Sequence, residues 1–496
     1  MKAEDLLSRW MRGGAASVTP EGQVAIATAS TGLAGKLRLA YEWIAAKAIL
    51  TSQGDIRSGP GRPVGRGGSA VELLEGPAYS SFILLPLLNL PLARRLVFVG
   101  SPGRGKTSVA TLMSLIAGSS FAETRRQIQH GHPQMSAQDL LGGPLPASLV
   151  KAESGADVRI DWRSWLRSRV KIVDEYNRIP TKTQSVLLSL LAEGYAEMYE
   201  QTHETGRSSW YLTANDELGG GTFPVIEALK DRIDAVVRCA PFQMESLDVL
   251  IERIARDEEP EAHIPADIVF SEAELAQMAQ EIRTVRFGPE LRELTAFVLG
   301  QLEFCRRASP RLDYMNKDTL HLSGRRIGHV CTEDCPLDRQ QNLCAQVDNG
   351  VSPRALQALV SFAQALAFFH GRQHVELNDI KQVVPWVLFD KLRPNLQSPF
   401  FEKDENRVLL HDRASWLGAL FELGVQQHAS YRPIREQVER SLAEAGNSRT
   451  ALPKRLSALE RQLAKLAEEC ELNAAVHADL LRLRQAHARL QRSQIG

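Results

Sequence analysis

Short apolar runs that end in turn residues alternate with longer helical patterns from about residue 94 onward. The runs 95–100, 169–175 and 210–216 have the length and composition of buried strands, whereas 107–118 and 181–194 repeat apolar residues every three or four positions, as helices do. Strands that alternate with helices in this way predict a parallel sheet that is covered by helices on both faces. We therefore expect an α/β core.

Helical periodicity dominates the rest of the chain. Residues 1–50 have mostly helical patterns, residues 272–305 read as helices, and residues 355–371 and 377–392 each read as a helix that is apolar on one side. Near the C-terminus, Leu456, Leu459, Leu463 and Leu466 are spaced by three, four and three residues. This spacing leaves a short coiled coil and a helical hairpin packed on the body as alternatives.

Residues 54–68, GDIRSGPGRPVGRGG, interrupt the first helical region. Glycine, proline and arginine predict a loop or hinge here. A solvated linker is favoured over a phosphate-binding role for the three arginines.

The segment GSPGRGKT, residues 100–107, fits the pattern G-x-x-x-x-G-K-[ST] and lies between a predicted strand and a predicted helix. Glycines let backbone N–H groups approach a polyphosphate, and the helix N-terminus adds a positive dipole. Lys106 is expected to reach the β- and γ-phosphates and Thr107 to hold Mg²⁺; the alternative is a plain glycine turn. The candidate nucleotide-binding residues are Gly100, Ser101, Pro102, Gly103, Arg104, Gly105, Lys106, Thr107, Ser108 and Asp174.

Two acids, Asp174 and Glu175, follow the apolar pair IV of RVKIVDE at the end of another predicted strand. In phosphate-loop enzymes a second strand supplies an acid beside the Mg²⁺, a role that suits Asp174. Glu175 suits the base that polarises the attacking water. The pair is weak evidence alone, and strong evidence together with the phosphate loop.

Three further segments carry a family resemblance. They are DEYNRIPTKTQSVLLSLLAEG (174–194), WYLTANDELGGGTFPVIEALKDRID (210–234) and GVSPRALQALVSFAQALAFFHGRQHVELNDIKQVVPWVLFDKL (350–392). With the phosphate loop, they resemble the AAA+ ATPases, and within them the MoxR family, over roughly residues 70–395. The resemblance implies that Asn215 orients the attacking water, that Arg232 is an arginine finger for the neighbouring subunit, and that Arg354 is the sensor-2 arginine of the lid.

The same resemblance implies a division of the chain. An N-terminal helical segment and linker (1–69) precede an AAA+ core (70–242), an all-α lid (243–395) with a cysteine-rich insertion (306–349), and a helical C-terminal region (396–496). Residues 137–166 look like the helix-2 insert of the family, and residues 195–210 look like its hairpin before the water-orienting asparagine.

The resemblance also implies a function, namely hydrolysis of ATP with Mg²⁺ by a ring oligomer, as a hexamer, that remodels or assembles a partner complex. The partner would be a separate protein with a von Willebrand factor A domain, since no D-x-S-x-S motif occurs in this chain. The alternative is a nucleic-acid-linked AAA+ motor of a restriction or defence system. ATP rather than GTP rests on the family alone, because no V-x-G-Q segment marks an adenine pocket before residue 94.

Charge and hydropathy narrow these alternatives. Lys plus Arg equals Asp plus Glu, 59 each, so the chain lacks the overall basic charge that favours nucleic acid. The most apolar run, residues 82–93, contains two prolines and is too short for a bilayer. The N-terminus does not resemble a signal peptide, so we expect a cytoplasmic protein without a membrane span.

Six cysteines without an export signal predict reduced thiols or metal ligands. Cys331, Cys335 and Cys344 form C-x₃-C-x₈-C, with Cys305 upstream and His329 as an alternative ligand. Four such ligands suit tetrahedral zinc, an iron–sulfur cluster is a second possibility, and unligated thiols are a third. The pair of histidines in HGHP (130–133) is interpreted as part of a loop rather than as a metal site.

Overall fold

The computed structural model describes residues 32–51, 53–59, 61–64, 71–74, 76–215, 222–239, 243–447 and 449–492. The predicted N-terminal helical segment lies outside these residues up to position 31, as does the predicted boundary at residue 242. The division of the chain into four segments stays a prediction.

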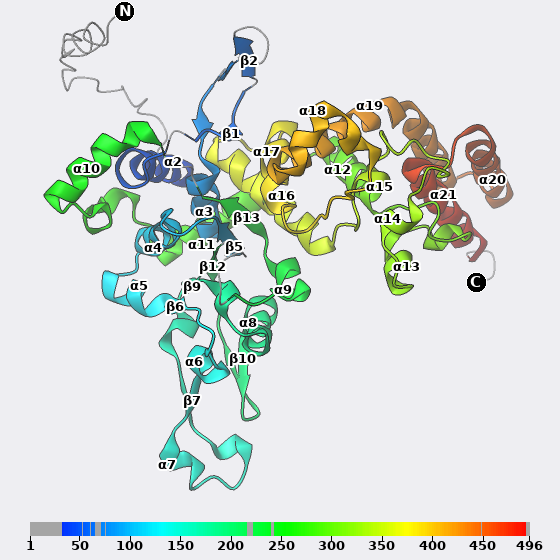
Figure 1. The fold of residues 1–496 in the computed structure, drawn as a ribbon. Helices are drawn as coiled ribbons and strands as arrows, with labels where there is room; N and C mark the ends of the chain where they lie inside the picture. The colour runs from blue at the N-terminus through cyan, green and yellow to red at the C-terminus, as the bar shows by residue number, and fades with distance from the viewer. Residues whose placement is uncertain are drawn as a thin grey trace, which may run out of the picture.

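A five-stranded parallel sheet forms the core, in the order β13-β5-β12-β9-β6 (Figure 1). The strands are β5 (Arg95–Val99), β6 (Ile128–His130), β9 (Val170–Asp174), β12 (Ser209–Ala214) and β13 (Ala235–Arg238). All six residues of β12 are buried, as are most of those in β5 and β9. Central strands of a parallel sheet are covered on both faces, which explains their continuous apolar runs. The predicted α/β core is confirmed.

Helices cover the sheet where the periodicity predicts them, in α4 (Lys106–Ile116) and α8 (Thr181–Glu193), and α9 (Glu227–Arg232) is a further short helix before β13. The apolar run with two prolines is a further helix, α3 (Ser81–Leu92), and all twelve of its residues are buried. It contacts β12 and β13 on one side and lid helices on the other. This double contact explains why α3 is apolar around its whole circumference.

Two insertions leave the core on the same side (Figure 1). Helix α5 (Phe121–Gln127) precedes the edge strand β6, and the first insertion follows that strand with α6 (Ala137–Leu141), α7 (Pro146–Leu149) and the antiparallel pair β7 (Gly142–Pro144) and β8 (Ile160–Trp162). The second is the hairpin of β10 (Tyr195–Met198) and β11 (Gln201–Glu204).

The N-terminal part begins with α2 (Leu33–Trp43), which continues as a π-helix to Ala48. The predicted loop 54–68 is not entirely a loop, because β1 (Ile56–Arg57) pairs with β4 (Ala78–Tyr79) and β2 (Gly61–Val64) pairs with β3 (Val71–Leu74). Backbone pairing with the segment that follows overrides the turn-rich composition.

The lid is all-helical. Its elements are α10 (Leu247–Arg256), α11 (Glu272–Thr284), α12 (Pro289–Glu303), α13 (Lys317–Leu322), α14 (Ile327–Val330), α15 (Leu343–Gln346), α16 (Pro353–Phe369) and α17 (Leu377–Val387). The last of these ends before the predicted residue 392.

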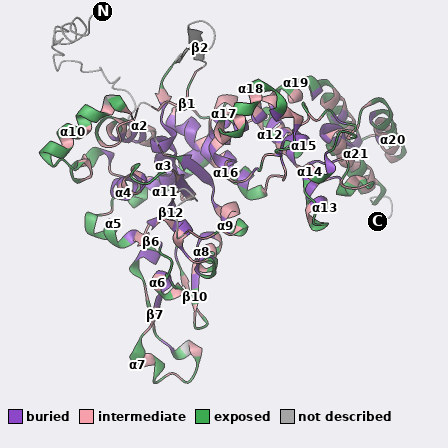
Figure 2. Ribbon diagram, viewed as in Figure 1, coloured by how far each residue is buried: buried purple, intermediate pink, exposed green. Residues whose placement is uncertain are grey.

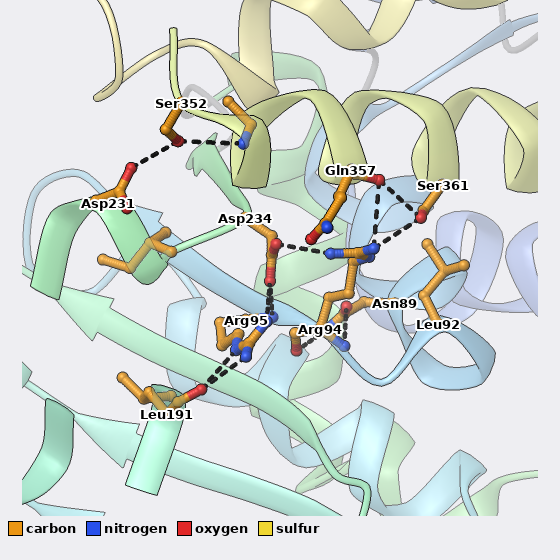
Figure 3. Close-up of polar contacts among 12 residues, drawn as sticks. Asn89, Leu92, Arg94, Arg95, Leu191, Asp231, Asp234, Ser352, Gln357 and Ser361 are labelled. Atoms are coloured by element: carbon orange, nitrogen blue, oxygen red, sulfur yellow. Dashed lines mark hydrogen bonds and ion pairs between the residues drawn. The ribbon is translucent and has the colours of Figure 1, made fainter. Parts of the chain in front are cut away.

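An ionic junction ties the lid to the amino-terminal edge of the sheet. Asp234 pairs with Arg94 at 2.9 Å and with Arg95 at 3.1 Å, and Arg94 also donates to Ser361 Oγ of α16 at 2.8 Å (Figure 3).

The C-terminal region contains α18 (Asp404–Arg407), α19 (Arg413–Gly446), α20 (Leu452–Glu469) and α21 (Ala474–Arg492). Leu459 and Leu466 of α20 are buried in one cluster with Val438 of α19 and Leu483 of α21. The leucine stripe therefore packs inside a three-helix unit. None of the helices in the described parts of the chain combines the length and apolarity that a bilayer span needs.

Candidate active site

The loop between β5 and α4 has the backbone shape that phosphate binding requires. Gly103 and Gly105 adopt φ of 73° and 74°, the left-handed region that favours glycine. Nothing lies within 4 Å of where a Cβ would stand at either position. The N–H groups at the start of α4 are therefore open to an anion.

Lys106 is buried at the base of this loop and is hydrogen-bonded to the backbone of the loop. Its Nζ donates to the carbonyl oxygens of Gly100 at 2.5 Å and Ser101 at 3.0 Å, and to Asn215 Oδ1 at 2.8 Å. Asn215 follows β12, the strand next to β5. The sheet thus brings the predicted phosphate-binding lysine and the predicted water-orienting asparagine into direct contact.

The two predicted Mg²⁺ ligands also meet. Thr107 Oγ1 donates to Asp174 Oδ1 at 2.8 Å, and Thr213 Oγ1 donates to the same oxygen at 2.7 Å. His130 Nδ1 lies 3.3 Å from the other carboxylate oxygen, Oδ2. A hydroxyl and a carboxylate beside open N–H groups fit Mg²⁺ with a polyphosphate, since Mg²⁺ in such sites takes few protein oxygens. Thr213 and His130 were not predicted.

Glu175 lies one residue beyond the strand, with φ of 52°. Its carboxylate accepts from Asn215 Nδ2 at 2.5 Å and pairs with Arg178 Nη1 at 2.7 Å, while its N–H donates to Thr213 Oγ1 at 2.8 Å. A cavity of about 390 Å³ is lined by residues 102–108 together with Asp174, Glu175, Thr213 and Asn215. The structure therefore brings the predicted phosphate loop, Mg²⁺ ligands and base around one space.

Gly131 explains the sequence HGHP. A Cβ at this position would stand 2.3 Å from the carbonyl oxygen of Glu175. The Gly131 N–H donates to the carbonyl oxygen of Asp174 at 2.7 Å. Only glycine allows the backbone after β6 to lie this close to the backbone of the two acids. The same close approach places His130 next to Asp174. Gly131 is buried in this turn, while the two histidines beside it are exposed.

Arg232 and Arg354 lie away from this cavity. Arg232 ends α9, just before β13, and β13 runs parallel to β5 with Ala235 opposite Leu96. The arginine is therefore at the amino-terminal edge of the sheet, whereas the phosphate loop follows the carboxyl end of β5. Arg354 is at the same edge, because its Nη1 pairs with Asp231 Oδ2 at 3.0 Å.

Asp231 holds the lid arginine beside α9. Burial alone would raise the pKa of this carboxyl, but hydrogen bonds from Ser352 and Arg354 and the charge of Lys391 hold it below its usual value. The hydrogen bond from Ser352 Oγ measures 2.8 Å (Figure 3). Arg354 is therefore held against α9, the helix that Arg232 ends.

The structure does not support the predicted zinc site. Within the described residues, no three His, Cys, Asp or Glu side chains are grouped so that they could hold a metal ion. Cys305 and Cys331 are buried in a small apolar cluster, and Cys335 and Cys344 pack against a second one. Burial raises the pKa of Cys305, and raises that of Cys331 to about 11 and that of Cys344 to about 12. The four thiols therefore pack with apolar side chains of the insertion, and their being unligated, the third alternative, stays a prediction.

Comparison with protein families agrees with this geometry. Residues 95–233 match the AAA domain of the dynein-related subfamily, and residues 339–412 match an AAA lid domain. The chain carries an AAA+ ATPase domain and its lid. The reaction of this domain is the conversion of ATP and water into ADP and phosphate.

Two similar proteins cover most of the ATPase. The chain is 25% identical to the uncharacterized protein YeaC of Bacillus subtilis (strain 168) over 341 residues. This alignment covers 68% of this chain and 82% of YeaC. A crystal structure of a candidate ATPase from Cytophaga hutchinsonii ATCC 33406 superposes with a TM-score of 0.50 and 17% identity, covering 77% of this chain and 94% of that one. The second similarity shows that the fold is shared.

Proposed function

We propose that the ATPase works as a ring, as a hexamer, in which Arg232 of one subunit completes the nucleotide site of the next. The observation that supports this is the position of Arg232 at the amino-terminal edge of the sheet, opposite the phosphate loop. An arginine that cannot reach its own triphosphate contributes to hydrolysis only when a neighbour presents it. Arg354 shares that edge, so we assign it to the same neighbouring site.

The other groups that bind the nucleotide, the Mg²⁺ and the attacking water come from a single subunit. The N–H groups of residues 103–108 and Lys106 bind the β- and γ-phosphates. Thr107 and Asp174 hold Mg²⁺, which neutralises phosphate charge. Lys106 must leave Asn215 to reach phosphate, and this frees the Asn215 amide oxygen for the attacking water.

Glu175 is the base that orients this water and accepts its proton. Its carboxylate is held between Asn215 and Arg178, which fixes its direction before a nucleotide arrives. Little covalent chemistry falls to the protein in such a reaction, since positioning and charge balance supply most of the catalysis.

We propose further that the ring is of the MoxR type, and that it remodels or assembles a partner complex together with a separate von Willebrand factor A domain protein. The motif resemblance over 174–392 supports this role, as does the pair of insertions that project from the core. Zero net charge favours a protein client over the alternative, a nucleic-acid-linked motor.

A trapping experiment tests this role. The Glu175→Gln variant binds ATP without turning it over and keeps the ring closed on its partners. Partners captured by this variant in ATP, but not by Lys106→Ala, are identified by mass spectrometry. A von Willebrand factor A domain protein in that set supports the proposal. Stimulation of the ATPase by DNA or RNA, with a steep salt dependence, would favour the nucleic-acid alternative instead.

A further inference from the structure

Helix α10 has an apolar side that no other part of the described chain covers. Leu247, Leu250, Ile251 and Ile254 recur at the three- and four-residue spacing of one helix face, and Met244 precedes them on that side. Ile254 is 79% exposed, Ile251 54% and Met244 75%. No residue of α10 is buried (Figure 2).

The opposite, more polar side of α10 attaches the helix to the body. Arg253 Nη1 donates to the carbonyl oxygen of Ala48 at 3.3 Å. Val249, Glu252 and Arg256 line a cavity of about 470 Å³ together with Trp43 and Lys47 of the N-terminal part. This arrangement reverses the usual one, in which a surface helix turns its apolar side inward. A contiguous apolar patch of this kind on a protein surface marks an interaction site.

The position of α10 indicates which molecule covers it. The chain reaches α10 from the carboxyl end of β13, where a Cβ added at Gly100 of the phosphate loop would stand 2.9 Å from Cys239 Sγ. Helix α10 and the arginine-bearing α9 lie on opposite sides of the central strands (Figure 1). In a ring that places each phosphate loop against the arginine edge of a neighbour, the α10 side of one subunit faces the α9 side of the next.

The α9 side offers a matching hollow. A cavity of about 1080 Å³ lies between α9, α12 and α16, and includes Lys230 and Asp231, the residues just before Arg232. Its lining combines the apolar Ala296, Leu299, Val351, Pro353 and Leu356 with a rim of charged residues, among them Glu227, Glu303, Asp318, Lys391 and Arg393. Leu356 is 39% exposed, so the hollow is open to apolar side chains from outside.

We propose that the apolar side of α10 in one subunit docks into the cavity between α9, α12 and α16 of a second copy of this chain. This inference rests on the proposed ring, and it names a contact outside the nucleotide site. Assembly then depends on apolar burial at α10, while Arg232 and Arg354 serve hydrolysis.

The test uses full-length protein in the Glu175→Gln background with saturating ATP, measured by light scattering. Ile251→Asp/Ile254→Asp alters the helix, and Leu356→Asp alters the cavity. We expect Ile251→Asp/Ile254→Asp to associate at least about 100-fold more weakly and Leu356→Asp at least about tenfold more weakly, because each buried aliphatic side chain contributes about tenfold or more. Val408→Asp is the matched control, since Val408 is 67% exposed at a place outside both surfaces. It should assemble normally.

An equal mixture of the two variants gives the decisive result. The intact α10 of Leu356→Asp can dock into the intact cavity of Ile251→Asp/Ile254→Asp, but no further subunit can add, so dimers should appear. Unchanged assembly of either variant, or a mixture that stays monomeric, would overturn the docking. Rings that persist in the helix variant with a new protease cut before Gly32 would assign residues 1–31 as the cover instead.

The Glu175→Gln protein without further substitutions distinguishes a failure of the docking proposal from a failure of the ring proposal. If it forms no oligomer with ATP, the ring proposal fails and the docking fails with it. If it forms rings that the helix variant also forms, only the docking fails. Nucleotide affinity within about twofold of the background shows that each variant is folded.

Discussion

Two inactive variants of this ATPase should restore activity to each other when mixed. Arg232→Ala removes the guanidinium from the amino-terminal edge of the sheet, and Lys106→Ala removes the phosphate-binding amine at the carboxyl edge. Each substitution alone should lower turnover strongly, by roughly 10³–10⁵-fold for the arginine. Arg232→Ala should still bind nucleotide, because Arg232 does not line the cavity at the phosphate loop.

The sheet itself sets the distance that makes the arginine act between subunits. Strand β5 has five residues, which at about 3.3 Å per residue separates its two ends by roughly 16 Å. An arginine side chain with bonds of about 1.5 Å reaches roughly 7 Å from its Cα. Arg232 precedes the amino end of the neighbouring strand β13, so its guanidinium stays well short of the phosphate loop of its own subunit.

The mixing assay measures ATP turnover as the ratio of the two variants is changed. In an equal mixture, half of the subunits carry intact Lys106 and half of their neighbours carry intact Arg232, so about a quarter of the sites in a ring are complete. Activity should peak at equal amounts, near a quarter of the wild-type value. A mixture of Lys106→Ala with Glu175→Gln is the control, because both residues line one pocket and no complete site can form.

Two outcomes would refute this reasoning. The first is a mixture of Arg232→Ala and Lys106→Ala that stays inactive while both proteins still assemble. The second is brisk turnover by Arg232→Ala alone, or by wild-type protein that remains a single subunit in saturating ATP.

Three further predictions concern the core and the insertion. Gly131→Ala should lower kcat at least about tenfold with little change in nucleotide affinity, because its Cβ would displace the backbone of Glu175; unchanged turnover would contradict the role of this turn. Burial lowers the pKa of Lys171 from 10.5 to about 7, so the unfolded chain binds more protons above pH 7. The free energy of unfolding should therefore rise by up to roughly 3 kcal/mol between pH 7 and 9.5. Denaturant titrations should measure this rise in the wild type and not in Lys171→Met. Cys331 and Cys344 should react with a disulfide reagent at pH 8 at least about 100-fold more slowly than after unfolding, since their raised pKa values leave little thiolate; stoichiometric zinc in untagged protein would contradict their role as packing groups.

Local pattern was sufficient for much of the fold. The strands around 95–99, 170–174 and 209–214 and the helices between them follow from period and turn residues, because a two-sided sheet leaves a direct record in apolar runs. The secondary structure of the apolar segment 81–92 could not be predicted in this way, since its two prolines lower helix propensity. Burial between the sheet and the lid makes it a helix nevertheless.

The candidate site divides in the same way. Lys106, Thr107, Asp174 and Glu175 could be found from the sequence, because each follows a strand and parallel strands end at one edge. His130 and Thr213 could not be found, since one of two histidines in a loop and a threonine inside an apolar strand carry no local signal. Their proximity to Asp174 depends on which strands are neighbours in the sheet.

The sequence by itself indicated the chemistry of this protein, because the phosphate loop and the pair of acids are each a short continuous motif. The spacing within each motif depends only on the backbone of one strand and the turn after it. Only the tertiary structure decided how these motifs and the rest of the chain pack together. It paired Arg354 with Asp231, the residue before Arg232, turned the apolar side of α10 outward, and packed the cysteines in two apolar clusters. Each of these outcomes depends on contacts between residues far apart in the chain, which no local pattern encodes.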